Sequence, residues 1–329
     1  MPNDIAPFKN ANSSMQPWPA IAPLGKVLRL RGERETVFYY DSGVPGSVVP
    51  DAAPADAGAD RKKPAILLIH GLGDEADSWR HLIPRLHAAG YRTLALDLPG
   101  FGRSAAPGRI SLGGHAAAAL RLLEAAYCAD PENPAVLVGN SMGAVVAEDA
   151  ARRRPDLVGS LILIDGCFPQ TAPLNSGLLF MALPVVGRKW YRAFRTNPEG
   201  AYRSLQGYYA DLEGLPGEDR QFLRERVIAR VKSDAQERAY FASLRSIILT
   251  GLTASRSMSR AMAAFPGKVL FLWGEADRVM PASSADRIRA LRPDAAFRII
   301  SGAGHLPQQE KPVETAGEIL SFLKADSGA

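Results

Sequence analysis

The sequence has few residues of the kind that staple small secreted domains or hold structural metals. Its 329 residues include only two cysteines, Cys128 and Cys167, and these are too far apart for a CxxC motif. A disulfide framework is therefore excluded, and a reducing, cytoplasmic location is expected. No apolar run approaches the roughly 18 residues that span a bilayer. Residues 1–25 contain five prolines and lack the charged and apolar parts of a secretory signal, so they are predicted to form an arm that is flexible or ordered only on contact.

A large excess of one charge is also lacking. The 39 Lys and Arg residues against 34 Asp and Glu residues leave a net charge of +5, and the basic residues are scattered without interleaved aromatics. A nucleic-acid partner is therefore not expected. His, Cys and carboxylate residues do not cluster at ligand spacing, so neither a metal nor a cofactor is predicted. A hydrophobic content of 47% with 22% charged residues is typical of a globular protein.

The first regular elements are two short segments rich in β-branched and aromatic residues. Lys26–Arg31 and Glu35–Asp41 are predicted to pair as an antiparallel hairpin. Residues 42–63 consist mostly of Ala, Pro, Gly and Asp, which predicts a flexible, solvated loop. The continuous apolar run Ala65–His70 then predicts a strand buried on both faces of a parallel sheet.

From this strand onward, helical and strand patterns alternate, which predicts a parallel sheet with right-handed crossovers. The predicted elements are a helix Glu75–Ala89, a strand Arg92–Asp97, a helix Leu112–Tyr127, a strand Ala135–Gly139, a helix Met142–Arg154 and a strand Ser160–Asp165. Residues 166–262 have helical periodicity without a strand and are interpreted as a helical insertion. The alternation resumes with a strand Lys268–Trp273, a helix Ala282–Leu291, a strand Ala296–Ile300 and a helix Glu310–Lys324.

The most specific motif is the stretch VLVGNSMG, in which Gly139, Ser141 and Gly143 match the pattern GxSxG between a strand and a helix. A serine on such a tight turn needs small neighbours, because the strained backbone brings adjacent turns close together. The amide of Met142, at the start of the following helix, is predicted to be one oxyanion donor. Ser141 is the predicted nucleophile.

A second turn, after the earlier strand Ala65–His70, supports that interpretation. The sequence HGLG places Leu72 where enzymes with such a serine turn have their second oxyanion amide. His70 is expected to brace this loop through hydrogen bonds and not to transfer protons.

A serine nucleophile requires a base and a group that orients the base. His305, in the glycine-rich loop GAGHLP, is the predicted base, and Asp277, in WGEADRVMP, is the predicted orienting acid. Asp165, at the end of the strand LILID, is the alternative acid, whereas Glu275 is expected to face solvent and Asp97 to tie down the turn after its strand. The remaining histidines lie in helical segments and are expected to be solvated or packed; they are His81, His87 and His115.

With these residues in place, the chain resembles the α/β-hydrolase superfamily from Lys26 to Lys324. The shared motifs are the HG turn, DLPGFGRS, GNSMG, the WGxxD strand end and GHxxxxE. The resemblance implies an α/β fold with a mostly parallel central sheet, helices on both faces and an inserted helical cap. The core would comprise residues 26–165 and 263–329, and the cap residues 166–262.

Departures from related subfamilies narrow the implied activity. Epoxide hydrolases and haloalkane dehalogenases use an aspartate where this chain has Ser141, and hydrolases of meta-cleavage products often differ from it at Ala144 and Leu306. The HGGG motif of one esterase group is replaced by HGLGD. The resemblance therefore favours a serine carboxylesterase, with a carbon-carbon hydrolase, an acyltransferase and a non-catalytic ligand-binding member as alternatives.

The segment Leu178–Trp190 mixes large apolar residues and is accompanied by Lys189, Arg192 and Arg195. It is interpreted either as an amphipathic helix with a solvated basic face or as the floor of an apolar channel with a cationic rim. The expected partner is a small, apolar acyl substrate, and peripheral contact with a membrane stays open. The sequence does not determine the oligomeric state.

Overall fold

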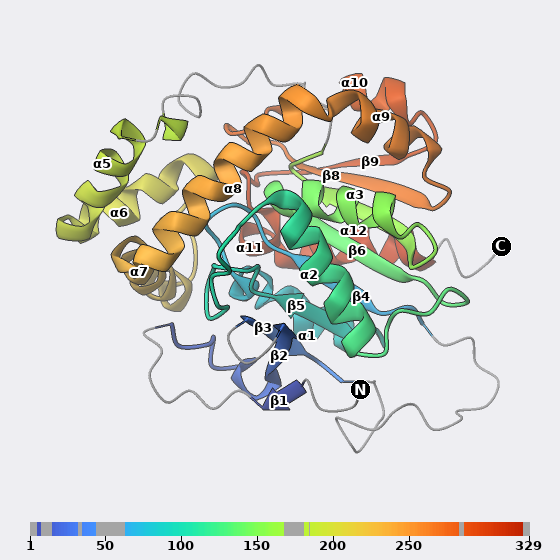
Figure 1. Cartoon of the computed structure of the whole chain (residues 1–329), viewed down its shortest axis with the longest axis horizontal. Coiled ribbons are helices and arrows are strands. Elements are labelled where there is room, and N and C mark those ends of the chain that lie inside the picture. The colour runs from blue at the N-terminus through green and yellow to red at the C-terminus, as the bar shows by residue number, and fades with distance from the viewer. Residues whose placement is uncertain are drawn as a thin grey trace.

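The central feature of the computed structural model is one twisted sheet (Figure 1). The structure describes residues 5–7, 15–31, 35–43, 63–167, 181–183, 185–282 and 286–324. Within these residues the sheet has nine strands in the order β1-β2-β3-β5-β4-β6-β7-β8-β9. The strands are β1 (Ile5–Pro7), β2 (Gly25–Arg31), β3 (Glu35–Asp41), β4 (Ile66–Ile69), β5 (Thr93–Leu96), β6 (Ala135–Asn140), β7 (Val158–Ile164), β8 (Lys268–Gly274) and β9 (Ala296–Ile300).

In the part of the sheet with the order β5-β4-β6-β7-β8-β9, neighbouring strands are parallel, as the alternating pattern predicts. Every residue of β4, β5 and β6 is buried, which is why these segments are continuously apolar in the sequence. The carboxyl ends of parallel strands meet at one edge of a sheet, so the loops after β4, β6, β7, β8 and β9 converge there.

At the amino-terminal side, β2 and β3 form the predicted antiparallel hairpin. The arm predicted for residues 1–25 is in part built into the fold, because β1 pairs with β2 and extends the sheet. An edge strand tolerates a proline such as Pro7. Trp18 is buried, and its amide donates a hydrogen bond to Asp77 at 2.7 Å. Of the predicted loop 42–63, residues 44–62 lie outside the described part of the chain.

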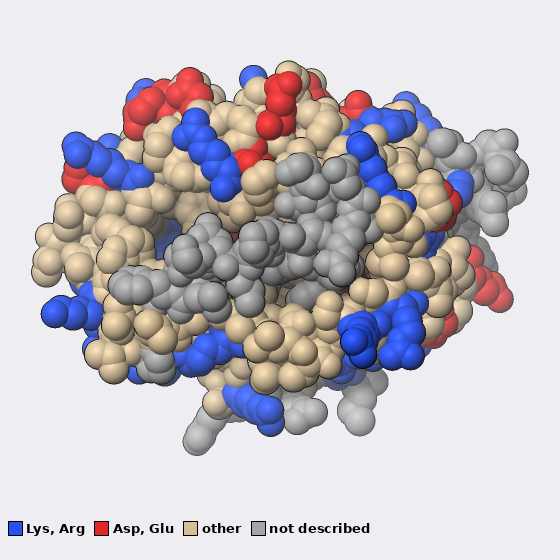
Figure 2. All heavy atoms as spheres, turned by 90° about the horizontal axis from the view of Figure 1, so that it is seen from above, with Lys and Arg blue, Asp and Glu red and all other residues tan. Residues whose placement is uncertain are grey.

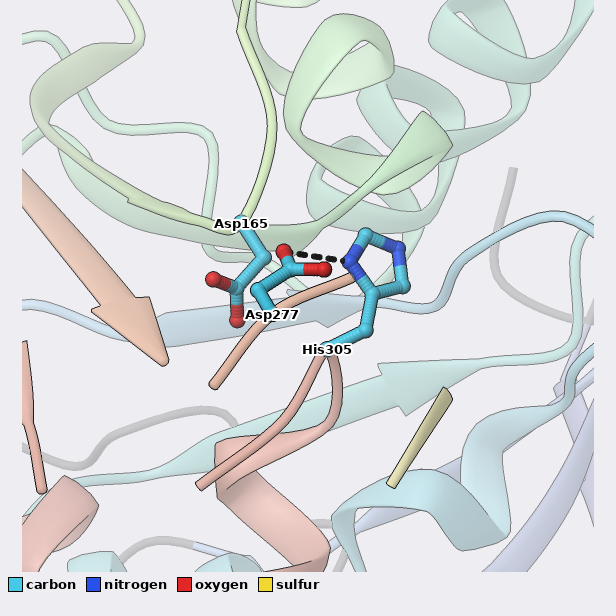
Figure 3. A group of neighbouring side chains, drawn as sticks. All are labelled: Asp165, Asp277 and His305. Carbon is cyan, nitrogen blue, oxygen red and sulfur yellow. Dashed lines mark hydrogen bonds and ion pairs between the residues drawn. The ribbon is translucent and has the colours of Figure 1, made fainter. Parts of the chain in front are cut away.

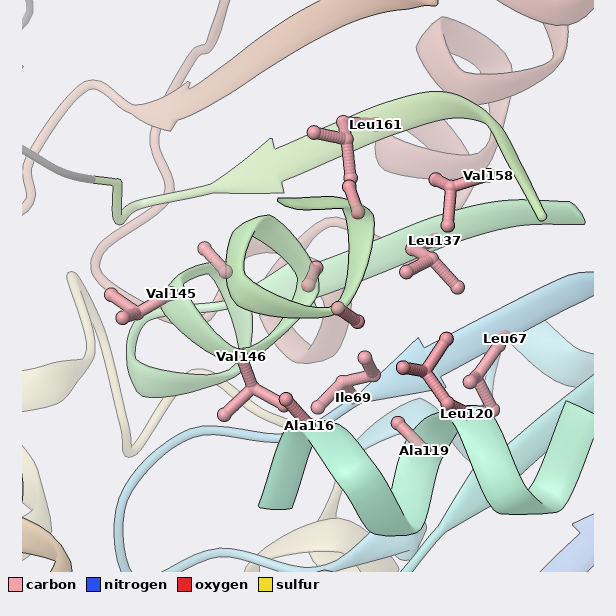
Figure 4. Close-up of a cluster of buried hydrophobic side chains, with 14 of the residues drawn as sticks. Leu67, Ile69, Ala116, Ala119, Leu120, Leu137, Val145, Val146, Val158 and Leu161 are labelled. Atoms are coloured by element: carbon pink, nitrogen blue, oxygen red, sulfur yellow. The ribbon is translucent and has the colours of Figure 1, made fainter. Parts of the chain in front are cut away.

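Helices cover both faces of the sheet. On one face, α2 (Leu112–Ala125) and α3 (Met142–Arg153) pack against β4, β6 and β7 through a cluster of aliphatic side chains (Figure 4). On the other face, α1 (Leu82–Ala88) packs against α12 (Pro312–Lys324). Each face of the sheet thus has its own cluster of buried apolar residues under the helices, which is the arrangement that a three-layer α/β fold requires.

Prolines set the starts of two predicted helices. The segment predicted as one helix from Glu75 to Ala89 consists of the 3₁₀ turn η2 (Ala76–Trp79) followed by α1. Pro84 lies in the first turn of α1, where its missing amide hydrogen is tolerated, but it cannot bond the carbonyl of Arg80 and so the α-helix does not extend further back. The helix predicted for Glu310–Lys324 is observed as α12, which begins at Pro312 and is preceded by the separate short helix α11 (Pro307–Glu310). For the helix predicted over Ala282–Leu291, the described helical part is α10 (Asp286–Leu291).

Between β7 and β8 the described residues are helical and contain no strand, as predicted for residues 166–262. The α-helices are α5 (Val186–Ala193), α6 (Pro198–Arg203), α7 (Gly217–Lys232), α8 (Asp234–Thr253) and α9 (Ser255–Ala264). The long helix α8 runs from the outer helices back to the sheet (Figure 1). There α8 contacts α2, and α9 packs on α3. Within the described part of the chain, no helix is both long and apolar enough to cross a membrane.

Buried ion pairs attach α7 to the loop after β4. Arg230 lies 2.7 Å from Asp74, and Arg226 lies 3.2 Å from Glu75, which is fully buried. Arg80 pairs with Asp219 at 2.6 Å. Because Asp74 is only two residues beyond Leu72, these ion pairs fix the helical segment next to the predicted oxyanion turn.

Candidate active site

Ser141 lies at the sharp turn between β6 and α3, as the GxSxG motif predicts. Its backbone has φ 55° and ψ −118°, a conformation that non-glycine residues rarely adopt. The turn is held by the Ser141 amide, which donates to the carbonyl of Ile164 at 2.9 Å. Strain of this kind persists only where the surroundings enforce it, and it is concentrated at functional sites.

The two glycines of the motif are required by close approach of backbone segments. A Cβ atom at Gly139 would overlap the backbone of Gly143, and one at Gly143 would overlap the carbonyl oxygen of Ile69 at the end of β4. The glycine spacing therefore brings α3 against two strand ends, which confirms the physical reason for the motif.

The HG turn after β4 lies directly against the serine. A Cβ atom built on Gly71 would be 3.3 Å from Cβ of Ser141. His70 is fully buried, accepts a hydrogen bond from the Leu98 amide at 2.9 Å and donates from Nδ1 to the carbonyl of Gly71 at 2.8 Å. Burial lowers the pKa of His70, so the ring is neutral and braces the turn as expected. Among the described residues, the amides of Leu72 and Met142 have no hydrogen-bond acceptor, which leaves both amides able to bind an anion.

His305 and Asp277 form a buried pair at the ends of the last strands (Figure 3). Nδ1 of His305 lies 2.8 Å from Oδ2 of Asp277. The other carboxylate oxygen of Asp277 accepts hydrogen bonds from the amides of Val279, at 2.7 Å, and Met280, at 2.9 Å. The carboxylate is thus fixed by its own loop and orients the imidazole. The Ser141 hydroxyl makes no hydrogen bond with a described residue; in unliganded sites this contact often forms only when substrate binds.

Asp165, the alternative acid, lies beside Asp277 but does not hydrogen-bond the imidazole (Figure 3). One of its carboxyl oxygens accepts a hydrogen bond from the Gly274 amide at 2.8 Å. Burial and the neighbouring charge of Asp277 raise the pKa of Asp165 well above its usual range. The raised pKa favours the neutral form of Asp165, and its contacts join the ends of β7 and β8.

Among the described residues, Asp165, Asp277 and His305 form a group that could hold a metal ion, since one ligand atom from each lies within 4.8 Å of the others. Their chemistry fits a cation poorly, because the imidazole nitrogen is already hydrogen-bonded to Asp277 and Asp165 favours its neutral form.

Three residues to which the sequence analysis gave no role hold this site together. Asn140, next to the serine, donates to the backbone carbonyl of His305 at 3.0 Å and thereby ties the two loops together. The His305 amide donates to the carbonyl of Tyr208 at 2.8 Å. Glu310 accepts hydrogen bonds from the amides of Gly304, at 2.6 Å, and Ala210, at 2.8 Å. Glu310 is the glutamate of the GHxxxxE motif, which was therefore a usable signal for this role.

The other candidates occupy structural positions. Asp97 is buried and accepts hydrogen bonds from the amides of Ala76 and Arg103, both at 2.7 Å. Glu275 is exposed and caps the turn at Gly302. Burial lowers the pKa of His115 to about 3, so that histidine is a neutral packing residue.

Comparison with known proteins identifies the family. A profile of the alpha/beta hydrolase family matches residues 66–318, so the chain belongs to this family of hydrolytic enzymes. Epoxide hydrolase 3 of Xenopus tropicalis is 28% identical over 324 residues, covering 93% of this chain and 82% of that protein. A 2-hydroxy-6-oxononadienedioate/2-hydroxy-6-oxononatrienedioate hydrolase of Paraburkholderia phymatum is 25% identical, covering 82% of this chain and 89% of that protein. A membrane phospholipase A, described as a bacterial virulence factor, superposes with a TM-score of 0.67 at 26% identity, covering 93% of this chain and 88% of that chain.

Proposed function

We propose that the protein is a serine hydrolase that cleaves carboxylic esters through an acyl-enzyme, with Ser141 as nucleophile, His305 as base and Asp277 as orienting acid. The observation that carries this proposal is the buried hydrogen bond of 2.8 Å between His305 and Asp277. The strained turn at Ser141, tied to the His305 loop through Asn140, supports it.

In the proposed reaction, Oγ of Ser141 attacks the carbonyl carbon of the ester while Nε2 of His305 accepts the hydroxyl proton. The amides of Leu72 and Met142 bind the oxyanion of the tetrahedral intermediate, and Asp277 stabilises the imidazolium without taking its proton. The intermediate collapses with loss of the alcohol, which takes the proton from His305. Water activated by His305 then hydrolyses the acyl-enzyme and releases the carboxylic acid.

We further assign residues 166–262 the role of a cap that defines the substrate. Two aromatic residues of this segment flank the predicted site. The ring of Tyr208 lies 6.0 Å from the ring of His305, and a Cβ atom on Gly73 would be 3.2 Å from Tyr240 on α8. Leu306 packs against the same apolar cluster as Tyr191 and Tyr209. Apolar and aromatic surroundings of this kind favour a small, apolar acyl substrate.

A carbon-carbon hydrolase is the second candidate, because relatives that match most of the chain are named as hydrolases of 2-hydroxy-6-oxononadienedioate, a dicarboxylate with no ester bond to cleave. The same serine, histidine and aspartate would serve such a reaction. The relative named epoxide hydrolase 3 does not lead to an epoxide proposal, because the serine at position 141 replaces the aspartate nucleophile of epoxide hydrolases.

The test is hydrolysis of p-nitrophenyl esters from acetate to a long-chain acyl group by the native chain and by Ser141→Ala. We expect cleavage by the native chain and a loss on the order of 10⁶-fold in kcat for the variant. Ser301→Ala is the matched control, since Ser301 is exposed and its described hydrogen-bond partner is the exposed Glu275. It should retain native activity.

Labelling by a fluorophosphonate separates the alternatives. Labelling of the native chain but not of Ser141→Ala, together with ester turnover, is the expected result. Labelling without ester turnover, followed by cleavage of a vinylogous 1,5-diketone, would assign the carbon-carbon reaction instead. Absence of labelling in a folded protein would overturn both enzymatic proposals.

A further inference from the structure

Exposed apolar side chains are concentrated at one point of the helical segment. Ten large hydrophobic residues in the described part of the chain are exposed, and four of them fall within residues 183–190. Their exposed fractions are 49% for Leu183, 78% for Val185, 38% for Val186 and 48% for Trp190. Single exposed apolar residues are ordinary, but four within eight residues form a patch.

The geometry of α5 explains why Val186 and Trp190 are exposed. Gly187 and Tyr191, four residues apart, are the buried residues of this helix, and Tyr191 packs on Phe241 of α8 at a ring distance of 5.7 Å. Val186 and Trp190 are also four residues apart and share a different face. The ring of Trp190 is held edge-on by Phe194 at 4.5 Å.

A basic rim borders this patch. It consists of Arg188, Lys189, Arg192 and Arg195. Glu237 of α8 accepts ion pairs from the three arginines, at 3.8 Å from Arg188 and 2.7 Å from both Arg192 and Arg195. Asp234 adds a second carboxylate at 2.8 Å from Arg195. Four cations therefore face two carboxylates, and the rim keeps a surplus of positive charge.

We propose that this surface, α5 together with Leu183 and Val185, docks the protein on a bilayer that contains anionic lipids. Apolar residues with a tryptophan on one face, next to lysine and arginine, are the features of a helix that lies in the membrane interface. The position of the helix agrees with such a role, because α5 lies at the outer end of the molecule, away from the sheet (Figure 1). At that end, Figure 2 shows tan surface with basic side chains at its edges and a smaller number of acidic ones beside them.

Charge favours a lipid surface over a second copy of the chain. A symmetric dimer through this patch would place the same surface on both subunits, so the two basic rims would face each other and repel. An anionic bilayer instead supplies the opposite charge, and each basic residue close to it adds attraction. Docking does not depend on ester cleavage. If the proposed function holds, docking would bring acyl lipids to the helical segment that contacts His305.

The test is co-sedimentation of the full chain with vesicles of phosphatidylcholine alone and of equal parts phosphatidylcholine and phosphatidylglycerol. We expect binding to the anionic vesicles that weakens as salt is raised, and little binding to phosphatidylcholine alone. The Ser141→Ala protein should bind as the native chain does, so the result stands apart from the outcome of the esterase test.

Paired variants locate the docking surface. Val185→Ser combined with Trp190→Ser should weaken binding about tenfold or more. Leu249→Ser combined with Leu252→Ser is the matched control, because these leucines are similarly exposed, at 60% and 72%, but lie on α8, and it should bind normally. Lys189→Glu should also weaken binding to anionic vesicles about tenfold, whereas Lys324→Glu, at the end of α12, should not.

Three results would overturn the proposal. They are absence of binding to anionic vesicles by the native chain, equal losses in the α8 control, and concentration-dependent self-association that the α5 variants abolish. The last result would assign the patch to contact between two copies of the chain.

Discussion

The site at the sheet edge and the helical segment between β7 and β8 are held by different mixtures of contacts. At the sheet edge, Glu310 accepts hydrogen bonds from backbone amides, and Asn140 donates to a backbone carbonyl. The helical segment joins this network through the backbone carbonyl of Tyr208, and it is attached elsewhere through side-chain ion pairs such as Arg230 with Asp74. Backbone contacts survive changes in side chains, whereas ion pairs disappear with one substitution. The ion-paired part of the segment should therefore be easier to loosen than the part that contacts the loop after β9.

Replacing the orienting acid should have the largest effect and sharpens the comparison within the sheet edge. Asp277→Asn should lower kcat for an ester about 10⁴-fold, because the amide cannot stabilise the imidazolium or fix its tautomer. Asp165→Asn is the matched control and should cost less than about tenfold, since an amide resembles the protonated carboxyl. Steady-state kinetics with a p-nitrophenyl ester would measure both. A larger loss from Asp165→Asn would reverse the two roles.

Breaking the attachment of the helical segment should mainly affect stability. Arg230→Met leaves Asp74 and Glu75 buried without this partner, and it should lower the free energy of unfolding by about 3–5 kcal/mol. Arg203→Met removes an exposed pair with Glu199 on the same segment and should leave Tm unchanged. Urea unfolding followed by fluorescence would measure the difference. Equal stabilities of the two variants would show that the buried ion pairs do not hold the helical segment in place.

A third test concerns the backbone contact beneath the nucleophile. Gly143→Ala adds a methyl group that overlaps the carbonyl of Ile69, and it should destabilise the fold by about 2–3 kcal/mol. Gly317→Ala in α12 meets open space and should stabilise the fold by about 0.5–1 kcal/mol. Thermal unfolding of both variants provides the measurement. If Gly143→Ala were as stable as the native chain, the close approach of α3 to β4 would not be required.

The smallest expected effect concerns the pH dependence of stability. The pKa of Asp165 is raised in the folded state, so the folded protein binds this proton more tightly than the unfolded chain does. The stabilising contribution is therefore complete below the unfolded pKa and is lost as pH rises toward the folded pKa. Asp165→Asn should then gain Tm relative to the native chain between pH 5 and pH 8. A Tm difference that stays constant over this range would show that Asp165 is not protonated.

Much of the fold followed from local pattern. The buried strands β4 and β6 are continuous apolar runs, and the glycines around Ser141 mark a turn that other residues could not form. Such features are visible in a sequence because burial and backbone strain act on neighbouring residues. Pro84 and Pro312 lie in the first turns of α1 and α12, so the starts of these helices are also marked locally.

The sequence by itself determined the alternation of strands and helices, the strained serine turn, and the order of serine, aspartate and histidine. Only the tertiary structure decided which carboxyl meets the imidazole, because Asp165 and Asp277 both follow strands whose ends lie side by side. It also decided that Asn140, Tyr208 and Glu310 hold the His305 loop, and that α5 turns its tryptophan outward. These outcomes depend on contacts between residues far apart in the chain, whose distances and orientations are set only when the sheet and the helices pack together.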